Sequence, residues 1–320
     1  MPLNPLYVEQ FGWVPNRPQL ELMQDPEIME RVRASFTGET SYTPPEVTVR
    51  DLTIDGPQGP GTVPIRIYSP LEPTNSEHLF VWSHGGGWIA GTLDEPENDW
   101  VARELVTRSG ITVITPDYAL ANGTTITYPT LHREVLATFN WTLEHAEELG
   151  GDPKKVVLGG ASAGANITVG AALEARDSGQ QQPAALVLAY PALHRSELLN
   201  HRNAALTAEV PPVLRLQYPT VTALLSAYLG ANADNAPYAS IDDQDVSGLP
   251  PALVLIDEYD DLRESAELFI ERVHAAGGSA TRYIAEGMAH GHLALPPTIE
   301  ETDRSLDVIG SFIQDQPANN

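Results

Sequence analysis

Two glycine-flanked motifs, about eighty residues apart, most constrain what this chain can fold into. The first reads His84-Gly85-Gly86-Gly87-Trp88, and the second reads Gly160-Ala161-Ser162-Ala163-Gly164. Glycine on both sides of a serine permits a tight turn from a strand into a helix, from which the serine oxygen projects as a nucleophile. Three consecutive glycines can bring two backbone N–H groups close to that oxygen, where negative charge would develop during an attack.

The two motifs differ in how specific they are. The serine motif is short, and with 25 glycines in 320 residues it can arise by chance. A histidine followed by three glycines is far rarer. The alternative is that both are ordinary glycine turns, one of which carries a serine. Each motif directly follows a predicted strand, and this placement favours the catalytic interpretation.

Runs typical of strands alternate with helical periodicity from residue 46 almost to the end of the chain. We predict strands at residues 46–55, 64–69, 78–83, 111–116, 156–158, 184–189, 252–256 and 280–284, with a glycine- and proline-rich turn at 56–61. We predict helices at 95–109, 129–149 and 298–314, and another after Ser162. This alternation predicts an α/β fold with a mostly parallel sheet covered by helices on both faces.

Two segments interrupt the alternation. Residues 1–45 are helical and rich in proline, and residues 194–240 form a long insertion with helical periodicity around 213–229. Ligands bind at the carboxyl ends of the strands in open α/β sheets, so we expect both segments to form a cap there. The catalytic domain would then comprise residues 46–193 and 241–320. Peripheral decoration is the alternative for both segments.

Composition excludes several classes of partner. The formal charge of −25 repels polyanions, so nucleic acid and anionic membranes are not expected partners. No apolar run approaches the roughly 18 residues of a membrane span. The first residues show no secretory pattern, and the chain has no cysteine to form disulfides or bind metal. We therefore expect a cytoplasmic protein.

A nucleophilic serine needs a base, and the base needs an acid that holds it in one tautomer. In folds of this type the chain order is serine, acid, histidine. The predicted strand at 252–256 is followed by Asp257, Asp260 and Asp261, and the last strand is followed by His290 and His292. Residue chemistry alone leaves the choice within each group open.

The chain resembles the hormone-sensitive-lipase-like branch of the α/β-hydrolases, a group of bacterial carboxylesterases and lipases. The resemblance spans nearly the whole chain from residue 46. It rests on the two motifs above and on Asp117-Tyr118, Asn166, Tyr190-Pro191, Gly248-Leu249-Pro250-Pro251-Ala252, Glu258-Tyr259-Asp260-Asp261-Leu262-Arg263 and Gly287-Met288-Ala289-His290-Gly291.

The resemblance implies a serine carboxylesterase that acts on short- to medium-chain acyl esters without a cofactor or a metal. Ser162 would be the nucleophile, Asp260 the orienting acid and His290 the base. The oxyanion-hole N–H groups would come from Gly86, Gly87 and Ala163. Trp88 and Tyr190 would line an apolar pocket, and His292 would occupy a place where an aromatic wall normally packs. The resemblance also permits a homodimer.

The chain departs from the family pattern in three places. The family usually reads Asp-Tyr-Arg-Leu-Ala-Pro-Glu where residues 117–123 stand, so an arginine and a glutamate that brace that loop are missing. The carboxylate expected in the following helix is Glu134 rather than an aspartate. The residue after Gly291 is His292 where phenylalanine is usual.

Two alternative functions follow from the same fold. An amidase or peptidase would need a site that anchors a peptide terminus, and no additional domain supplies one. A non-catalytic ligand-binding member would usually have lost the base, whereas His290 is present.

Overall fold

One twisted sheet organises the chain in the computed structural model, which describes residues 1–37, 42–57, 61–195 and 204–319. Within these residues the sheet has eight strands. They are β1 Thr48–Asp55, β2 Thr62–Ser69, β3 Leu79–Ser83, β4 Thr112–Pro116, β5 Val156–Ala161, β6 Leu186–Ala189, β7 Ala252–Tyr259 and β8 Ala280–Ala289.

The sheet is antiparallel at one edge and parallel elsewhere. Its order is β1-β2-β4-β3-β5-β6-β7-β8, with β2 antiparallel to both β1 and β4. The remaining neighbours are parallel, so the ends of β5, β7 and β8 that carry the functional loops lie along one edge. The strands β3, β4 and β5 are buried along their whole length, as expected for parallel strands covered on both faces.

Helices cover both faces of the sheet. Apolar side chains of α5 Thr130–Glu144, α6 Ala163–Asp177 and α9 Arg263–Ala275 share one core cluster. Those of α4 Pro96–Ser109 and α10 Glu300–Gln314 share the other. Local sequence sets these ends. Proline stands at the first position of α4, and Gly110 ends that helix with a left-handed φ of 64°. The predicted α/β fold is confirmed.

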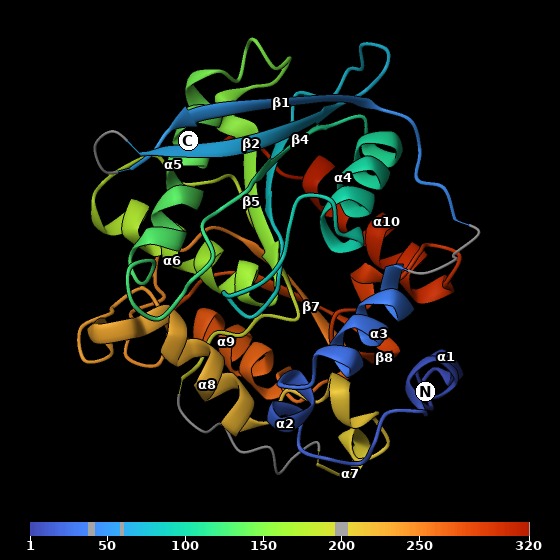
Figure 1. Ribbon diagram of the computed structural model, residues 1–320. Helices are drawn as coiled ribbons and strands as arrows, with labels where there is room; N and C mark the ends of the chain where they lie inside the picture. The colour runs from blue at the N-terminus through green and yellow to red at the C-terminus, as the bar shows by residue number, and fades with distance from the viewer. Residues whose placement is uncertain (38–41, 58–60, 196–203, 320) are drawn as a thin grey trace.

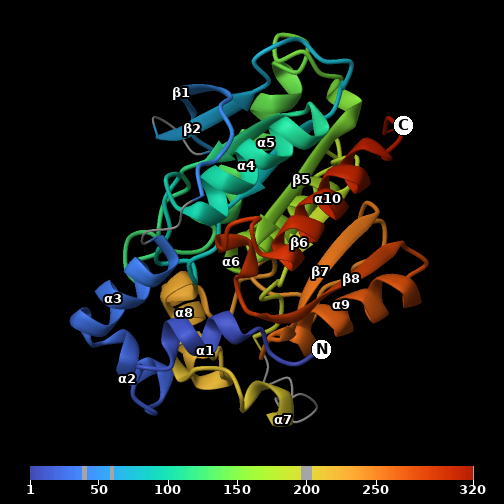
Figure 2. The same ribbon diagram turned by 90° about the vertical axis from the view of Figure 1, so that its right-hand side faces the viewer.

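The N-terminal helices and the long insertion gather beyond one end of the sheet, at the opposite end from β1 (Figures 1 and 2). These elements are α1 Pro5–Phe11, α2 Gln19–Met23, α3 Pro26–Thr37, α7 Ala204–Thr207 and α8 Tyr218–Leu229. Phe11, Leu22 and Val213 belong to a third core cluster, which also includes Met288 of β8 and Leu295 from the segment after it. Short 3₁₀ turns lie between these elements at Pro153–Lys155, Pro212–Leu214, Gly230–Asn232 and His292–Ala294.

Several predicted boundaries differ from the observed ones. The strands predicted at 252–256 and 280–284 continue to Tyr259 and Ala289, because β7 and β8 pair beyond Asp257 across an irregularity in register. The helix predicted to reach residue 149 ends at Glu144, after which the chain continues in hydrogen-bonded turns. Parts of the segments predicted at 1–45, 56–61 and 194–240 lie outside the described residues.

Candidate active site

Ser162 lies on a strained turn between β5 and α6. Its φ of 53° and ψ of −115° lie in a region that residues other than glycine rarely adopt. Its N–H donates to the carbonyl of Ala189 at 2.9 Å. A Cβ at Gly160 would come within 2.5 Å of the Gly164 backbone, and a Cβ at Gly164 within 2.2 Å of the Ser83 carbonyl oxygen. Close packing of backbone therefore requires both glycines and fixes the serine between them.

His290 and Asp260 reach this serine from two neighbouring strands. His290 follows β8, and Asp260 follows β7 directly after the irregular pairing between Asp257 and Tyr259. The His290 Nε2 atom lies 2.9 Å from Ser162 Oγ, and its Nδ1 atom lies 2.7 Å from Asp260 Oδ2. The structure thus brings together three of the predicted site residues in one chain of contacts from carboxylate to hydroxyl.

The surroundings raise the pKa of His290 above its ordinary value. Burial is the largest single effect and lowers this pKa, but the charge and the hydrogen bond of Asp260, together with the smaller contributions of Asp257 and Glu97, outweigh it. Burial raises the pKa of Asp260, and His290 and the Leu262 N–H, 2.9 Å from Asp260 Oδ1, oppose that rise. An imidazole with a raised pKa accepts a proton from a hydroxyl group more readily.

Two segments outside the sheet, the long insertion and the N-terminal segment, contact the loop that carries Asp260. Arg215, in the long insertion, forms a two-contact ion pair with the neighbouring Asp261 at 2.8 and 2.9 Å. The Asp261 side chain is only 2% exposed, so this ion pair is shielded from solvent. On the other side of the loop, the hydroxyl of Tyr259 donates to the carbonyl of Met1 at 2.8 Å. The position of the acid therefore depends on both segments.

The loop after β3 turns sharply at three consecutive residues with positive φ. The values are 109° at Gly86, 60° at Gly87 and 65° at Trp88. A Cβ at Gly86 would lie 2.0 Å from the Ala90 carbonyl oxygen, so only glycine fits there. Gly86, Gly87, Ala163 and Ser162 line the same cavity. Ala163 is the first residue of α6, where N–H groups have no acceptor within the helix.

His84, which precedes these glycines, is a buried structural residue. Its ring stacks on Tyr118 at a centroid distance of 4.4 Å, and the Tyr118 hydroxyl donates to the His84 carbonyl at 2.7 Å. Burial lowers the pKa of His84 to about 4, so the ring is neutral near pH 7. A Cβ at Gly91 would lie 2.2 Å from the His84 ring, so residue 91 must also be a glycine.

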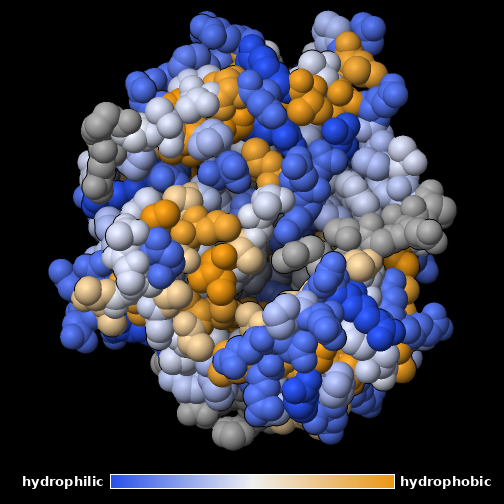
Figure 3. Space-filling view, in the orientation of Figure 1, coloured by the Kyte–Doolittle hydropathy of each residue, from blue (hydrophilic) through white to orange (hydrophobic). Residues whose placement is uncertain are grey.

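Two cavities meet at His290, and one of them also includes Ser162. One, of about 300 Å³, is lined by Trp88, Ser162, Leu224 and their neighbours, and we call it the Trp88 cavity. The other, of about 320 Å³, is lined by Val32, Gly291, Ala294 and their neighbours, and we call it the Val32 cavity. Both include Gln19, Gly86, Glu97, Leu216 and His290. Figure 3 shows apolar side chains beside a hollow near the middle of the face that Figure 1 presents.

Trp88 lines the cavity that we name after it, and several contacts fix its position. Its indole N–H donates to the Asn166 side-chain oxygen at 3.1 Å. Its ring lies almost parallel to that of Tyr228, at 6° and a centroid distance of 6.0 Å. Its carbonyl accepts the N–H of Ala121 at 2.8 Å. The cavity therefore has a rigid aromatic wall.

The expectation that His292 lines the pocket is wrong. Its side chain is fully buried, with Nδ1 2.5 Å from Asp257 Oδ1 and Nε2 2.8 Å from Ser305 Oγ. Gly291, with a φ of 85°, starts a 3₁₀ turn, in which His292 packs between β7 and α10. Ser305, His292 and Asp257 thus form a second chain of contacts, which we call the buried array.

Tyr190 also differs from its predicted role, because it lines neither of these cavities. It is 1% exposed, and its hydroxyl donates to Glu97 Oε1 at 2.8 Å. Its ring is edge-on to those of His290 and His292, at centroid distances of 5.0 and 5.6 Å. Tyr190 therefore packs against both histidines rather than lining a cavity.

The loop at residues 117–123 is braced by groups other than the missing arginine and glutamate. Glu134 Oε2 accepts the N–H of Ala119 at 2.6 Å. The side-chain oxygen of Asn122 accepts three backbone N–H groups, from Thr124, Thr125 and Ile126, at 2.9 to 3.0 Å. Glu134 and Asn122 together hold the loop that supports Trp88.

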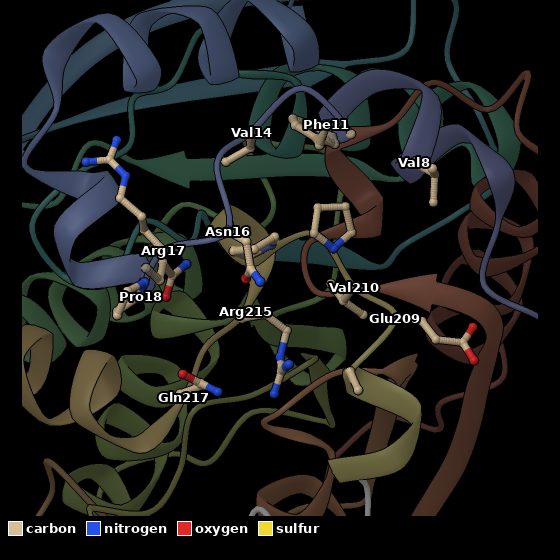
Figure 4. Close-up of a pocket in the computed structure, with 15 residues that line it drawn as sticks. Val8, Phe11, Val14, Asn16, Arg17, Pro18, Glu209, Val210, Arg215 and Gln217 are labelled. Carbon is tan, nitrogen blue, oxygen red and sulfur yellow. The ribbon is translucent and has the colours of Figure 1, made fainter.

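A larger cavity of about 540 Å³ lies away from Ser162, between α1 and the segment at residues 208–217. Figure 4 shows Arg17 and Glu209 on opposite sides of it in that view, with Asn16 and Arg215 between them. Size alone therefore does not locate the chemistry here, because the two smaller cavities contain the serine and the histidine.

Residues 1–37, 42–57, 61–195 and 204–319 contain no group of three or more histidine, aspartate or glutamate side chains placed to hold a metal ion. Among the same residues, no helix combines the length and apolar character needed to cross a bilayer.

The parallel sheet, the strained serine after β5 and the acid and histidine after β7 and β8 define the class of an α/β hydrolase. A family model described as "alpha/beta hydrolase fold" matches residues 80–294. The chain belongs to this family, in its hormone-sensitive-lipase-like branch.

Its relatives include named esterases. Carboxylesterase NlhH of Mycobacterium tuberculosis is 32% identical over 272 residues, which cover 82% of each chain. An arylesterase of Saccharolobus solfataricus is 30% identical over 259 residues, or 79% of each chain. The solved structure of an esterase from Pyrobaculum calidifontis superposes with a TM-score of 0.80 at 28% identity, covering 98% of both chains.

Sequence reasoning missed Glu97 and Ser305 as parts of the site region, and it considered Asp257 only as one of three candidate acids beside Asp260 and Asp261. Glu97 follows Asp94-Glu95-Pro96 at the start of a helix, where acidic residues are normally solvated. Ser305 lies among polar residues of a C-terminal helix. Only the residue that Glu97 or Ser305 contacts in space reveals its part in the site region, and that residue lies up to 93 positions away in the sequence.

Proposed function

We propose that this carboxylic ester hydrolase works through an acyl-enzyme on Ser162, with His290 as the base and Asp260 as the orienting acid. The observation that carries the proposal is the continuous contact chain at 2.7 and 2.9 Å, which ends at a strained serine facing a cavity. Such an arrangement activates a hydroxyl that is otherwise a weak nucleophile.

In the proposed reaction, Ser162 Oγ attacks the ester carbonyl carbon while His290 Nε2 takes its proton. The carbonyl oxygen becomes negatively charged and accepts hydrogen bonds from the N–H groups of Gly86, Gly87 and Ala163. Each donor of this kind typically contributes about 2.7–4 kcal/mol. His290 then gives its proton to the departing alcohol oxygen, and a water molecule activated by the same imidazole releases the acid.

The two cavities support an assignment of the two halves of the ester. The Trp88 cavity contains the three proposed oxyanion donors, so we assign it to the acyl group. The Val32 cavity extends beyond His290 along Gly291 and Ala294, and we assign it to the alcohol, because the base must reach the leaving oxygen. Their volumes, about 300 and 320 Å³, suit small esters.

We further propose that residues 1–45 and 194–240 form the cap over a catalytic domain of residues 46–193 and 241–320. Gln19, Met23 and Val32 from the first segment line the cavities, as do Leu216 and Leu224 from the second. Residues 38–41 and 196–203 of the proposed cap lie outside the described residues.

Two measurements test the proposed function. A fluorophosphonate probe should modify the wild-type protein once, with the adduct on Ser162, and should not modify Ser162→Ala. Adducts on other serines alone would refute the assignment. In a series of p-nitrophenyl esters, kcat/KM should be highest for roughly two- to six-carbon acyl groups and should fall steeply beyond about ten. Preference for long acyl groups would contradict the assignment of the Trp88 cavity.

A further inference from the structure

Glu97 connects the glycine loop to the region beside the histidine. Its Oε2 atom accepts the N–H of Gly85 at 2.6 Å, one residue before Gly86. Its Oε1 atom accepts the hydroxyl of Tyr190 at 2.8 Å. The backbone carbonyl of the same residue accepts the indole N–H of Trp82 at 3.0 Å, which fixes the start of α4 against β3. One carboxyl group thus holds two different loops of the site.

Tyr190 completes the connection to the imidazole. It follows β6 with a φ of 36°, and its N–H donates to the Leu255 carbonyl at 2.8 Å. A positive φ at a tyrosine is strained, and such strain persists only where the surroundings impose it. The ring meets His290 edge-on at an interplanar angle of 68°. The tyrosine therefore supports one flank of the proposed base and is itself held by Glu97.

We propose that Glu97 and Tyr190 are positioning residues that fix the glycine loop and the His290 ring relative to each other. The proposal rests on the proposed function, because the alignment matters only if His290 and the N–H groups of Gly86 and Gly87 act on the same ester. A bonded path then runs from Gly85 through Glu97 to Tyr190 and its ring contact with the imidazole. A loss of either hydrogen bond loosens the alignment without removing a reacting group.

Glu97 also has an electrostatic effect that separates it from a purely structural residue. The groups whose charge acts on His290 are Asp260 and Asp257 from the β7 side and Glu97 from α4, and all three raise the pKa of the imidazole. Burial raises the pKa of Glu97 itself, and the hydrogen bonds from Tyr190 and Gly85, together with the charge of His290, oppose that rise. Removal of the Glu97 charge should therefore lower the pKa of the base.

The test compares Glu97→Gln, Tyr190→Phe and a matched control, Tyr68→Phe. Tyr68 is a fully buried tyrosine whose hydroxyl donates to Asp99 at 3.1 Å, and it lines neither cavity. The measurement is kcat and KM for p-nitrophenyl butyrate from pH 5 to 9, with thermal unfolding recorded for each variant. The wild type and Ser162→Ala establish separately whether the proposed function holds.

For Glu97→Gln we expect kcat to fall about 10- to 100-fold, with KM changed less than about twofold, because misalignment affects chemistry more than binding. The acid limb of its pH profile should move to lower pH. Tyr190→Phe keeps the ring and the Glu97 carboxylate, so kcat should fall less and the acid limb should stay near the wild-type position. Tyr68→Phe should resemble the wild type in both.

Three outcomes would overturn the proposal: an unchanged kcat in Glu97→Gln, an acid limb that does not move in that variant, or equal losses in Tyr190→Phe and Tyr68→Phe. If Glu97→Gln does not fold, the comparison of kcat between Tyr190→Phe and Tyr68→Phe decides. The rate at which a fluorophosphonate labels Ser162 in these two variants is then a second readout. Inactivity of the wild type would refute the proposed function instead.

Discussion

The Tyr190 ring contacts the histidines of two Ser-His-Asp arrays. In the first, Ser162, His290 and Asp260 are linked at 2.9 and 2.7 Å, and the serine and histidine line a cavity. In the buried array, the corresponding distances are 2.8 and 2.5 Å, and both the histidine and the serine are fully buried. The residue types, the bonding order and the use of the histidine nitrogens are the same.

What differs is access and backbone geometry. Ser162 is strained at a turn and lies beside N–H groups at the start of α6, whereas Ser305 lies within the helix α10. No ester carbonyl can reach a fully buried hydroxyl. The comparison predicts that three side chains of the right types at hydrogen-bond distance are not enough to make a serine nucleophilic. Substrate access and N–H groups aimed at the developing charge are also needed.

The largest expected contrast is between the two serines. Ser162→Ala should reduce kcat for p-nitrophenyl butyrate on the order of 10⁴- to 10⁶-fold, because a catalytic array fails as a unit. Ser305→Ala should keep kcat within about threefold, since its array contacts no substrate. The comparison breaks down if Ser162→Ala retains more than about a tenth of the wild-type rate.

The two aspartates should differ nearly as much. Asp260→Asn should lower kcat about 10⁴-fold, because the amide favours the wrong tautomer of His290. Asp257→Asn should retain most of the wild-type kcat at its optimal pH, since Asp257 contacts the other histidine. Kinetics at saturating ester on variants of equal circular dichroism would check this. Equal losses in both variants would mean that the arrays are functionally coupled.

Of the two histidines, His292 should matter more for the free energy of unfolding, and His290 should matter more for turnover. His292→Phe leaves a buried aspartate without its partner, and the free energy of unfolding should fall by about 3–5 kcal/mol. His290→Ala, at the cavity, should change it much less while abolishing turnover. Urea unfolding measures both. A His292→Phe variant with wild-type stability and an altered KM would instead restore the pocket-wall interpretation.

The smallest effect concerns pH. Because the proposed base His290 would act when deprotonated and its pKa is raised, kcat/KM should rise with pH through a value above the ordinary one for histidine. The negative charge of Asp257 stabilises the protonated ring of His290. Its replacement by asparagine should therefore move this limb to lower pH, and a pH–rate profile would show the shift. A limb that moves upward would contradict the assigned sign.

Much of the fold and part of the site can be predicted from the sequence. The alternation of elements and the order of the motifs predict the α/β sheet, and the fold and family are confirmed. The motif positions predict only that Ser162 meets an acid after one strand and a histidine after another, and the family resemblance selects Asp260 and His290, which do contact one another and Ser162. Their catalytic roles stay predictions.

The errors arise where orientation depends on a partner distant in sequence. His290 and His292 share one glycine-containing loop, and only the φ of Gly291 and the presence of Asp257 and Ser305 turn the second histidine inward. Tyr190 looks like a pocket aromatic until Glu97, 93 residues earlier, accepts its hydroxyl. The sequence around His292 and around Tyr190 does not contain these partners. Periodicity therefore cannot tell whether either side chain lines the pocket or lies in the interior.

The ion pair between Arg215 and Asp261 limits how this enzyme could be re-engineered. The insertion that shapes the cavities also carries the arginine that fixes the residue next to Asp260. A chimera that received its insertion from another esterase would change the substrate pocket and the support of the acid in one step. Such a graft would have to bring an equivalent cation, or replace Asp261 together with the insertion, before a change of specificity could be separated from a loss of catalysis.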